Sequence, residues 1–331
     1  MYAMPQTVRG FFLTLAVVWA AGSIGGIFYA LQQNIPVAAS LPVLAALLVE
    51  ASFYIGTVLE LPRNRFEQAL SAPVRAAVLA VSAVLPYLLY TVPLGLAQPG
   101  NLLLLLAIGG LIAAWFVVFP FRGGFAAVLL VAMAAILLSK IFTGIYPRPY
   151  ERVRVDILGQ LMLFRLGIMA FLSFGKQDGI RLGFLPERRE WVVGLRWFLL
   201  FAPLAGLVNV FIGFARFAPP PLPWWQLALL AVGTFAAFLW VIALCEEFFF
   251  RGVLQQWLAR GFGNDMAGLI AASLLFGSVH LWFRQFPNYR FALLAAIAGV
   301  FYGLAFREGR GIRAAMVTHA LVVAAWRTLF S

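Results

Sequence analysis

Long apolar runs constrain this chain more than any other feature of its sequence. A helix needs roughly 20 apolar residues to cross a bilayer. Ten stretches reach or approach that length: about 11–31, 37–60, 74–96, 101–121, 123–143, 192–214, 224–245, 266–283, 291–306 and 314–330. An eleventh, about 157–174, is interrupted by Arg165 and either spans the membrane or lies in its interface. The sequence therefore predicts an all-α, polytopic membrane helix bundle of about ten or eleven transmembrane helices.

The composition excludes an ordinary water-soluble protein. Hydrophobic residues make up 63% of the chain and charged residues only 11%, whereas soluble domains carry about 25% charged residues. The net charge of +12 comes from basic residues that fall mainly between the apolar runs. Such loops follow the positive-inside rule, so we expect a lipid bilayer and not nucleic acid as the partner. The single cysteine excludes an internal disulfide and a Cys-rich metal site.

The most polar part of the chain separates two groups of apolar runs. This segment, 144–190, ends with the run Glu-Arg-Arg-Glu at 187–190. We expect an N-terminal transmembrane bundle of unknown role at 1–143, a polar linker with a possible extra span at 144–190, and a C-terminal transmembrane bundle at 191–331. No cleavable signal peptide is evident, and the run 11–31 is long enough to remain as an anchor.

Basic loops predict the orientation of the C-terminal half. If the spans alternate, one side receives Lys176, Arg181, Arg188, Arg189, Arg251, Arg260, Arg307, Arg310 and Arg313. The other side receives Arg216, Arg284, Arg290 and Arg327. The side with more basic residues should face the cytoplasm.

An acidic pair lies inside one apolar run of this half. Glu247 and Arg251 are four residues apart and share a helix face, so they can pair within the membrane. Glu246 points about 100° away from Glu247 and has no basic residue one turn before or after it. The spacing predicts a structural role for the Glu247–Arg251 pair and leaves Glu246 free to meet a group from another helix. Such a carboxylate can exchange protons with a water molecule.

The two histidines of the chain, His280 and His319, lie in apolar runs further along. Ionisable side chains are costly in lipid and usually mark function there. Glu246 precedes Arg260 by fourteen residues, and His280 follows Asp265 by fifteen. In unbroken helices both side chains would lie roughly 21–22 Å from the shared turn, at matching heights. His319 is six residues past Arg313, or roughly 9 Å, which does not match unless its helix starts earlier or the bundle is tilted.

Three motifs together resemble a known family. They are Glu246-Glu247-x-x-x-Arg251, Phe276-x-x-x-His280, and a third segment containing His319. In this order and spacing they resemble the CPBP family of CAAX-processing and bacteriocin-processing glutamic-type intramembrane endopeptidases, which is similar to the Ras-converting prenyl-protein proteases. The resemblance covers about residues 178–330 and leaves the N-terminal spans outside it.

The resemblance implies roles for the motif residues. Glu246 and His280 would activate the attacking water, His319 would help to stabilise the oxyanion, and Glu247–Arg251 would brace the site without a metal. The family usually has Asn or another polar residue four positions after the third-motif histidine, where this chain has Val323. Loss of one oxyanion donor typically costs about 10²–10³ in rate. This departure leaves three options: another group substitutes, the substrate class differs, or the chain is a weakened or non-proteolytic member.

The expected function is an intramembrane endopeptidase that hydrolyses a peptide bond in a membrane-anchored protein or peptide. In a bacterium it would lie in the cytoplasmic membrane, and prenylated substrates would require a host that prenylates proteins. One alternative is a zinc protease with Glu246, His280 and His319 as ligands, although no H-E-x-x-H is present. A second is a non-catalytic scaffold or immunity-type protein. A third is a proton-coupled transporter, which the absence of an obvious inverted repeat disfavours.

Overall fold

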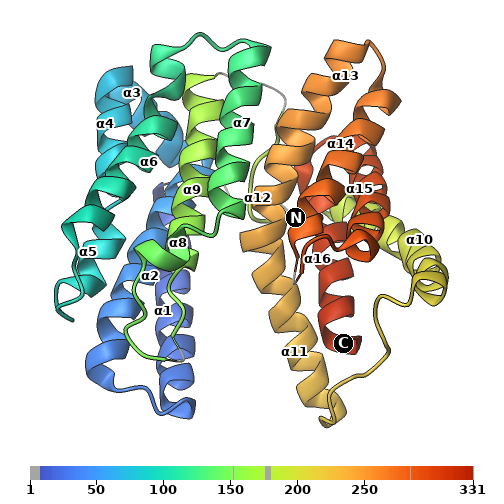
Figure 1. The fold of residues 1–331 in the computed structure, drawn as a ribbon, viewed down its shortest axis with the longest axis horizontal. Coiled ribbons are helices and arrows are strands. Elements are labelled where there is room, and N and C mark those ends of the chain that lie inside the picture. The colour runs from blue at the N-terminus through green and yellow to red at the C-terminus, as the bar shows by residue number, and fades with distance from the viewer. Residues whose placement is uncertain (1–7, 152, 176–179, 284, 331) are drawn as a thin grey trace. The chain divides into compact units, whose positions relative to one another are not determined.

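The computed structural model describes residues 8–151, 153–175, 180–283 and 285–330. Predictions that fall on residues 1–7, Lys176, residues 178–179, Arg284 and Ser331 lie outside the described residues. The chain divides into two compact units, Met1–Asp178 and Gly179–Ser331 (Figure 1). This boundary falls inside the segment 144–190, and most of that segment is in the first unit.

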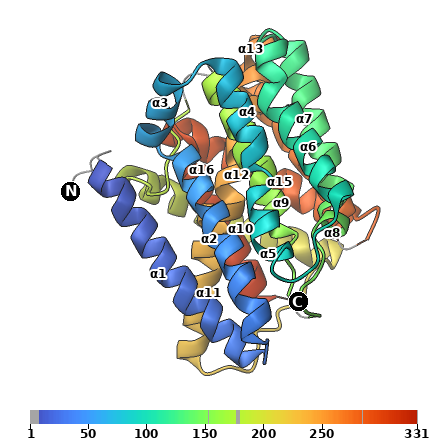
Figure 2. The same ribbon diagram turned by 90° about the vertical axis from the view of Figure 1, so that its left-hand side faces the viewer.

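The N-terminal unit consists of helices only, within the described residues. They are α1 (Val8–Gln32), α2 (Val37–Val58), α3 (Glu60–Ala69), α4 (Ala72–Ser82), α5 (Leu85–Thr91), α6 (Pro99–Val118), α7 (Gly123–Leu138), α8 (Phe142–Ile145) and α9 (Ile157–Met169), which continues as the π-helical turn η1 (Ala170–Phe174). Helix α2 packs against α1, α5 and α9 (Figure 2). Helix α9 also contacts α6 and α7, so it forms the centre of this unit.

A buried ion pair ties α2 to α9. Glu50 and Arg165 are 0% and 1% exposed, and their side chains meet with Arg165 Nε 2.6 Å from Glu50 Oε1. The guanidinium also donates to the hydroxyl and the backbone oxygen of Ser82, at 2.8 and 3.0 Å. Arg165, which interrupts the apolar run 157–174 in the sequence, is thus neutralised inside the unit.

The C-terminal unit is also helical. Its elements are α10 (Arg188–Ile212), α11 (Trp224–Ala237), η2 (Phe238–Ala243), α12 (Leu244–Glu247), η3 (Phe248–Gln255), α13 (Gln256–Phe262), α14 (Asp265–Val279), η4 (His280–Trp282), α15 (Tyr289–Gly309) and α16 (Ile312–Leu329). Elements α11 to α13 form one continuous rod with π-helical turns, drawn in gold and orange in Figure 1. Helix α16 contacts α10, α11, α12 and α15, so it is the central helix of this unit.

Local sequence signals set the helix ends near the site. Gly263 ends α13 at φ +61°, a conformation that glycine adopts without strain. Asn264 then caps α14, because its side chain accepts hydrogen bonds from the Met266 and Ala267 amides. Asn288 caps α15 in the same way through the Phe291 amide. These caps fix where the helices that carry His280 and Tyr302 begin.

Nine helices in the described part of the chain are long and apolar enough to cross a membrane, including Ile157–Phe174. The all-α, polytopic fold class is therefore confirmed, and the protein is an integral membrane protein. The number of candidate spans is slightly lower than the predicted ten or eleven. Helix α7, Gly123–Leu138, is shorter than a full span, and α16, which carries Arg313, His319 and Arg327, is not among the nine.

Candidate active site

The acidic pair lies at a break in helical geometry. The short α-helical segment α12 ends with Glu246 and Glu247 and is flanked by the π-helical turns η2 and η3. π-Turns inside α-helices are rare and frequently occur at functional sites. Here they place two neighbouring carboxylates in different surroundings. The Glu247 side chain is 0% exposed, whereas that of Glu246 is 27% exposed, so only Glu246 is accessible to a substrate.

Glu247 is the fixed centre of the cluster. Its Oε2 lies 3.1 Å from Arg251 Nε, and its Oε1 accepts a hydrogen bond of 3.3 Å from Arg251 Nη1. Arg251 Nη2 also donates to the backbone oxygen of Gly299 on α15, at 3.0 Å. The Arg251 side chain is 1% exposed, so its charge is neutralised within the protein. The pairing of Glu247 with Arg251, four residues apart, agrees with the sequence spacing.

His319 connects this fixed pair to Glu246. Its Nδ1 lies 2.8 Å from Glu247 Oε1, and because a carboxylate paired with arginine only accepts, Nδ1 carries the proton. Its Nε2 lies 3.8 Å from Glu246 Oε2. A buried carboxylate thus orients the imidazole, which presents its second nitrogen to the partly exposed carboxylate. The same logic operates in hydrolase triads.

His280 lies at the end of α14, where the helix tightens into the 3₁₀ turn η4. Its Nδ1 is 2.7 Å from the backbone oxygen of Phe276. A carbonyl oxygen accepts only, so Nδ1 holds the proton, and in the neutral ring Nε2 has a free lone pair. His280 and His319 both contact the ring of Phe276, so the two imidazoles lie on the same side of the cluster.

Glu246 has an unsatisfied oxygen in this setting. Its Oε2 is buried and has no hydrogen-bond partner among the described residues. Buried carboxylate oxygens are normally hydrogen-bonded, and an exception calls for a missing partner such as a water or a substrate. The sequence prediction that Glu246 faces another helix fits this geometry. The partner nearest to its Oε2 is on α16, however, and no hydrogen bond or ion pair joins Glu246 directly to His280 within the described residues.

Aromatic residues that the sequence reasoning gave no role hold the two imidazoles. Tyr302 stacks on His319 with ring centroids 4.5 Å apart and an interplanar angle of 13°. Phe276 contacts both imidazoles, with centroid distances of 4.6 Å to His280 and 5.8 Å to His319. The Arg251 guanidinium lies 4.6 Å from the centre of the Phe276 ring. Phe276 lies in the quoted motif Phe276-x-x-x-His280, which was the signal that could have identified it, whereas no quoted motif contains Tyr302.

The position at which α16 begins does not explain why His319 lies at the level of the acidic pair. Helix α16 begins at Ile312, so an earlier start does not bring His319 to the acidic pair. The estimate of roughly 9 Å assumed regular helices with ends at one level. The rod that carries Glu246 instead passes through π-turns, which change its rise and phase, and α12 packs directly on α16. Val323 follows His319 by about one turn and supplies no polar group.

No three His, Cys, Asp or Glu side chains group closely enough to hold a metal ion in the part of the chain that the structure describes. The zinc alternative, with Glu246, His280 and His319 as ligands, therefore has no preformed ligand set among these residues. That catalysis needs no metal stays a prediction, which an activity assay with chelators would test.

Residues 223–325 match the family model described as type II CAAX prenyl endopeptidase Rce1-like. Residues 223–325 are thus similar to the Rce1-like family. This Rce1-like segment covers less than half of the chain, runs from the start of α11 into α16, and contains all five candidate site residues. It confirms the family resemblance drawn from the three motifs. Curated proteins and solved structures gave no significant match.

Proposed function

We propose that the C-terminal unit is a membrane-embedded endopeptidase in which Glu246 is the general base. One observation carries the proposal: Glu246 Oε2 is buried without a hydrogen-bond partner in the described chain and faces His319 Nε2 at 3.8 Å. The Rce1-like segment supports protease activity, because the family is described as an endopeptidase. The assignment of Glu246, His280 and His319 to individual steps is our inference from the geometry.

The proposed reaction is hydrolysis of one peptide bond. Glu246 takes a proton from a water molecule whose oxygen attacks the scissile carbonyl carbon, and the carbonyl oxygen becomes an oxyanion. The carbon–nitrogen bond then breaks, and Glu246 returns its proton to the leaving amine. No metal takes part in this scheme. The partial exposure of Glu246 allows substrate access, while the fully buried Glu247 cannot serve this role.

His280 would position the water. Its Nδ1 is held by the Phe276 carbonyl, so Nε2 is the nitrogen available to accept a hydrogen bond. With Glu246 as a second acceptor, both protons of the attacking water would be engaged and one oxygen lone pair would face the substrate. The contacts of the His280 ring with Phe276 and Phe291, at 4.6 and 4.9 Å, would keep the imidazole in this orientation.

His319 would stabilise the oxyanion. When His319 carries both ring protons, the buried group of Glu246, Glu247, Arg251 and His319 is electrically neutral, which lowers its desolvation cost in the membrane. Nε2 can then donate to a developing negative charge, and Glu247 stabilises the imidazolium through Nδ1 at 2.8 Å.

The proposed substrate is a membrane-associated protein or peptide. Three helices that surround the site, including Trp224–Phe262 and Tyr289–Gly309, are candidate membrane spans, so a substrate would have to reach the site from the bilayer or its surface. We propose the cytoplasmic membrane as the location if the host is a bacterium. Prenylated proteins remain one substrate class, and other membrane-anchored peptides are another.

Val323 favours one competing function, a non-catalytic scaffold of the same family. An apolar residue at this position supplies no second donor to an oxyanion. A scaffold would preserve the fold and the Glu247–Arg251 pair but would not depend on Glu246. The two functions therefore differ in what happens when Glu246 alone is changed.

The deciding experiment measures cleavage of membrane-anchored peptides by the full-length protein in liposomes. One peptide carries a prenylated C-terminal cysteine motif and another a transmembrane anchor. We expect Glu246→Gln to lower the rate by about 10²–10⁴ and His280→Gln to lower it as well. Glu308→Gln is the matched control, because Glu308 pairs with Arg196 and Trp197 outside the cluster and should leave the rate unchanged.

Equal cleavage by wild type and Glu246→Gln would contradict the general-base role. If the wild type cleaves no peptide, a host phenotype that survives Glu246→Gln would favour the scaffold.

A further inference from the structure

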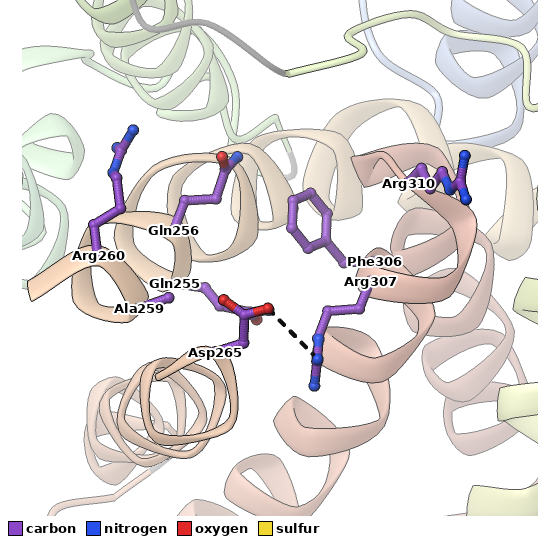
Figure 3. A pocket seen from close by; sticks show the side chains of 8 residues that line it. All are labelled: Gln255, Gln256, Ala259, Arg260, Asp265, Phe306, Arg307 and Arg310. Carbon is purple, nitrogen blue, oxygen red and sulfur yellow. Dashed lines mark ion pairs between the residues drawn. The ribbon is translucent and has the colours of Figure 1, made fainter. Parts of the chain in front are cut away.

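A polar cavity lies in the C-terminal unit, and none of the five candidate active-site residues lines it. It has a volume of about 330 Å³ and is lined by residues from η3, α13, α14 and the end of α15. Figure 3 shows three arginines around it, Arg260, Arg307 and Arg310. Its volume is at the lower end of the range for small-ligand sites, about 300–1,000 Å³. It would therefore hold a polar headgroup rather than a whole lipid.

The charges around the cavity are incompletely paired. The guanidinium groups of Arg260 and Arg310 make no ion pair or hydrogen bond within the described residues. Arg307 lies 3.6 Å from Asp265, as the dashed line in Figure 3 marks, but Asp265 is 75% exposed, and an ion pair this accessible to water is weak. Three guanidinium groups and one carboxylate leave the lining with a net positive charge of two. Arginine binds phosphate oxygens through paired N–H donors, so the lining suits a phosphate group.

The position of the cavity along the helices points to the membrane surface. Arg260 lies two residues before the end of the candidate span Trp224–Phe262, and Asp265 is the first residue of Asp265–Trp282. Arg307 and Arg310 flank the end of Tyr289–Gly309. Three candidate spans thus begin or end around the cavity, which places it at one end of the helix bundle. Phe306 adds an apolar contact to the lining.

Arg310 has an unusual backbone conformation for its residue type. It follows the last residue of α15 at φ +57°, in the left-handed region where non-glycine residues are uncommon. Glycines stand on both sides of it, at 309 and 311, but the position that favours glycine holds arginine. The backbone turn would favour glycine at position 310, so we attribute the arginine at this position to a role of its side chain.

From these observations we propose that the cavity binds the phosphate of an anionic phospholipid at the basic face of the C-terminal unit. Basic pockets between transmembrane helices on the cytoplasmic side are suited to such headgroups. The arginines would also interact favourably with the negative C-terminal ends of the helix dipoles of α13 and α15, and this stabilisation would not require a bound lipid. The proposal does not rest on the endopeptidase function, because it concerns binding and not hydrolysis.

The test is lipid binding to the full-length protein in detergent, measured by native mass spectrometry with phosphatidylglycerol and phosphatidylcholine. We expect the wild type to bind phosphatidylglycerol more tightly than phosphatidylcholine. Each of Arg260→Gln and Arg310→Gly should weaken the binding of phosphatidylglycerol by about fivefold. Arg290→Gln is the matched control: Arg290 is an exposed arginine at the start of α15, at the opposite end of that helix from Arg307 and Arg310, and its removal should leave the affinity unchanged.

Arg310→Gly also separates binding from folding. Glycine tolerates φ +57°, so this variant should unfold at the same or a higher temperature than the wild type in zwitterionic detergent. Equal phosphatidylglycerol affinity in the wild type and both cavity variants would overturn the proposal. Inorganic phosphate or glycerol phosphate that binds at the same concentration as the lipid would identify a soluble ligand instead. Displacement of the lipid by a peptide with a free C-terminal carboxylate, but not by its amide, would reassign the cavity to substrate.

Discussion

Each unit of this chain buries a glutamate–arginine pair, and the two pairs have different surroundings. In the N-terminal unit, Arg165 uses its donors on Glu50 and on the hydroxyl and backbone oxygen of Ser82. In the C-terminal unit, Arg251 holds Glu247 and the Gly299 carbonyl, but Glu247 is shared with His319. The first pair joins two helices, and the hydrogen bonds described for it reach no further titratable side chain. The second continues through an imidazole to Glu246.

This difference separates structural ionisable groups from chemical ones. Both arginines are 1% exposed and both glutamates 0%, so burial alone does not distinguish the two pairs. What distinguishes them is the presence of further titratable groups whose hydrogen bonds are incomplete. Glu246 has such an oxygen in the described chain, and Glu50 does not. A buried charge in the membrane is therefore a candidate for function when its hydrogen bonds are incomplete, and a structural group when partners satisfy it.

The sharpest test of the comparison exchanges the two glutamates for glutamine in separate variants. Glu247→Gln should lower kcat by about 10²–10⁴, because an amide no longer orients His319 or stabilises its charge. Glu50→Gln should leave kcat unchanged once the rate is normalised to folded protein. Rates in liposomes, with the folded fraction from size-exclusion chromatography, provide the measurement. Equal losses of kcat in the two variants would remove the distinction between the pairs.

The N-terminal pair should instead dominate stability. Arg165→Met leaves Glu50 buried and uncompensated, so we expect a loss of about 3–5 kcal/mol in the free energy of unfolding. The double variant Glu50→Leu with Arg165→Met removes both charges and should recover most of that loss. Hydrogen exchange of peptides from α2 and α9 would follow the effect in this unit. A double variant as unstable as the single one would show that the pair contributes more than mutual neutralisation.

Restoring a polar side chain beside His319 should give a smaller gain. Val323→Asn adds an amide donor about one turn beyond His319, and we expect kcat to rise, by up to about 10²-fold. Val322→Asn is the control, because it adds the same group at a neighbouring position on a different face of α16. A gain in both variants, or in neither, would show that a missing donor at position 323 does not limit the rate.

Metal removal should have the smallest effect. We expect a strong chelator to leave kcat unchanged, because the proposed chemistry uses carboxylate and imidazole groups alone. The measurement is the liposome assay before and after extended chelation, followed by addition of zinc. Loss of activity that zinc restores would favour Glu246, His280 and His319 as metal ligands.

Much of the fold could be predicted because a membrane-spanning helix is recognisable from the amino-acid composition of its own segment. Runs of about 20 apolar residues predicted the helices, and one-turn spacing predicted the Glu247–Arg251 pair. Glu50 and Arg165 were visible as buried charges, yet their pairing was not, since it joins residues 115 positions apart. The aromatic contacts of His319 could not be predicted either, because they depend on how α14, α15 and α16 pack.

The sequence by itself determined the helical membrane fold, the family of the C-terminal segment and the residue types of the candidate site, because apolar length and motif order are local properties of a chain. The tertiary structure decided which carboxylate meets which imidazole. His319 faces Glu246 although its distance from the helix start argued against it, because π-turns and helix packing, rather than residue counts, set the height of a side chain. It also decided that three arginines from two separate helix ends surround one cavity, an arrangement that no single segment contains.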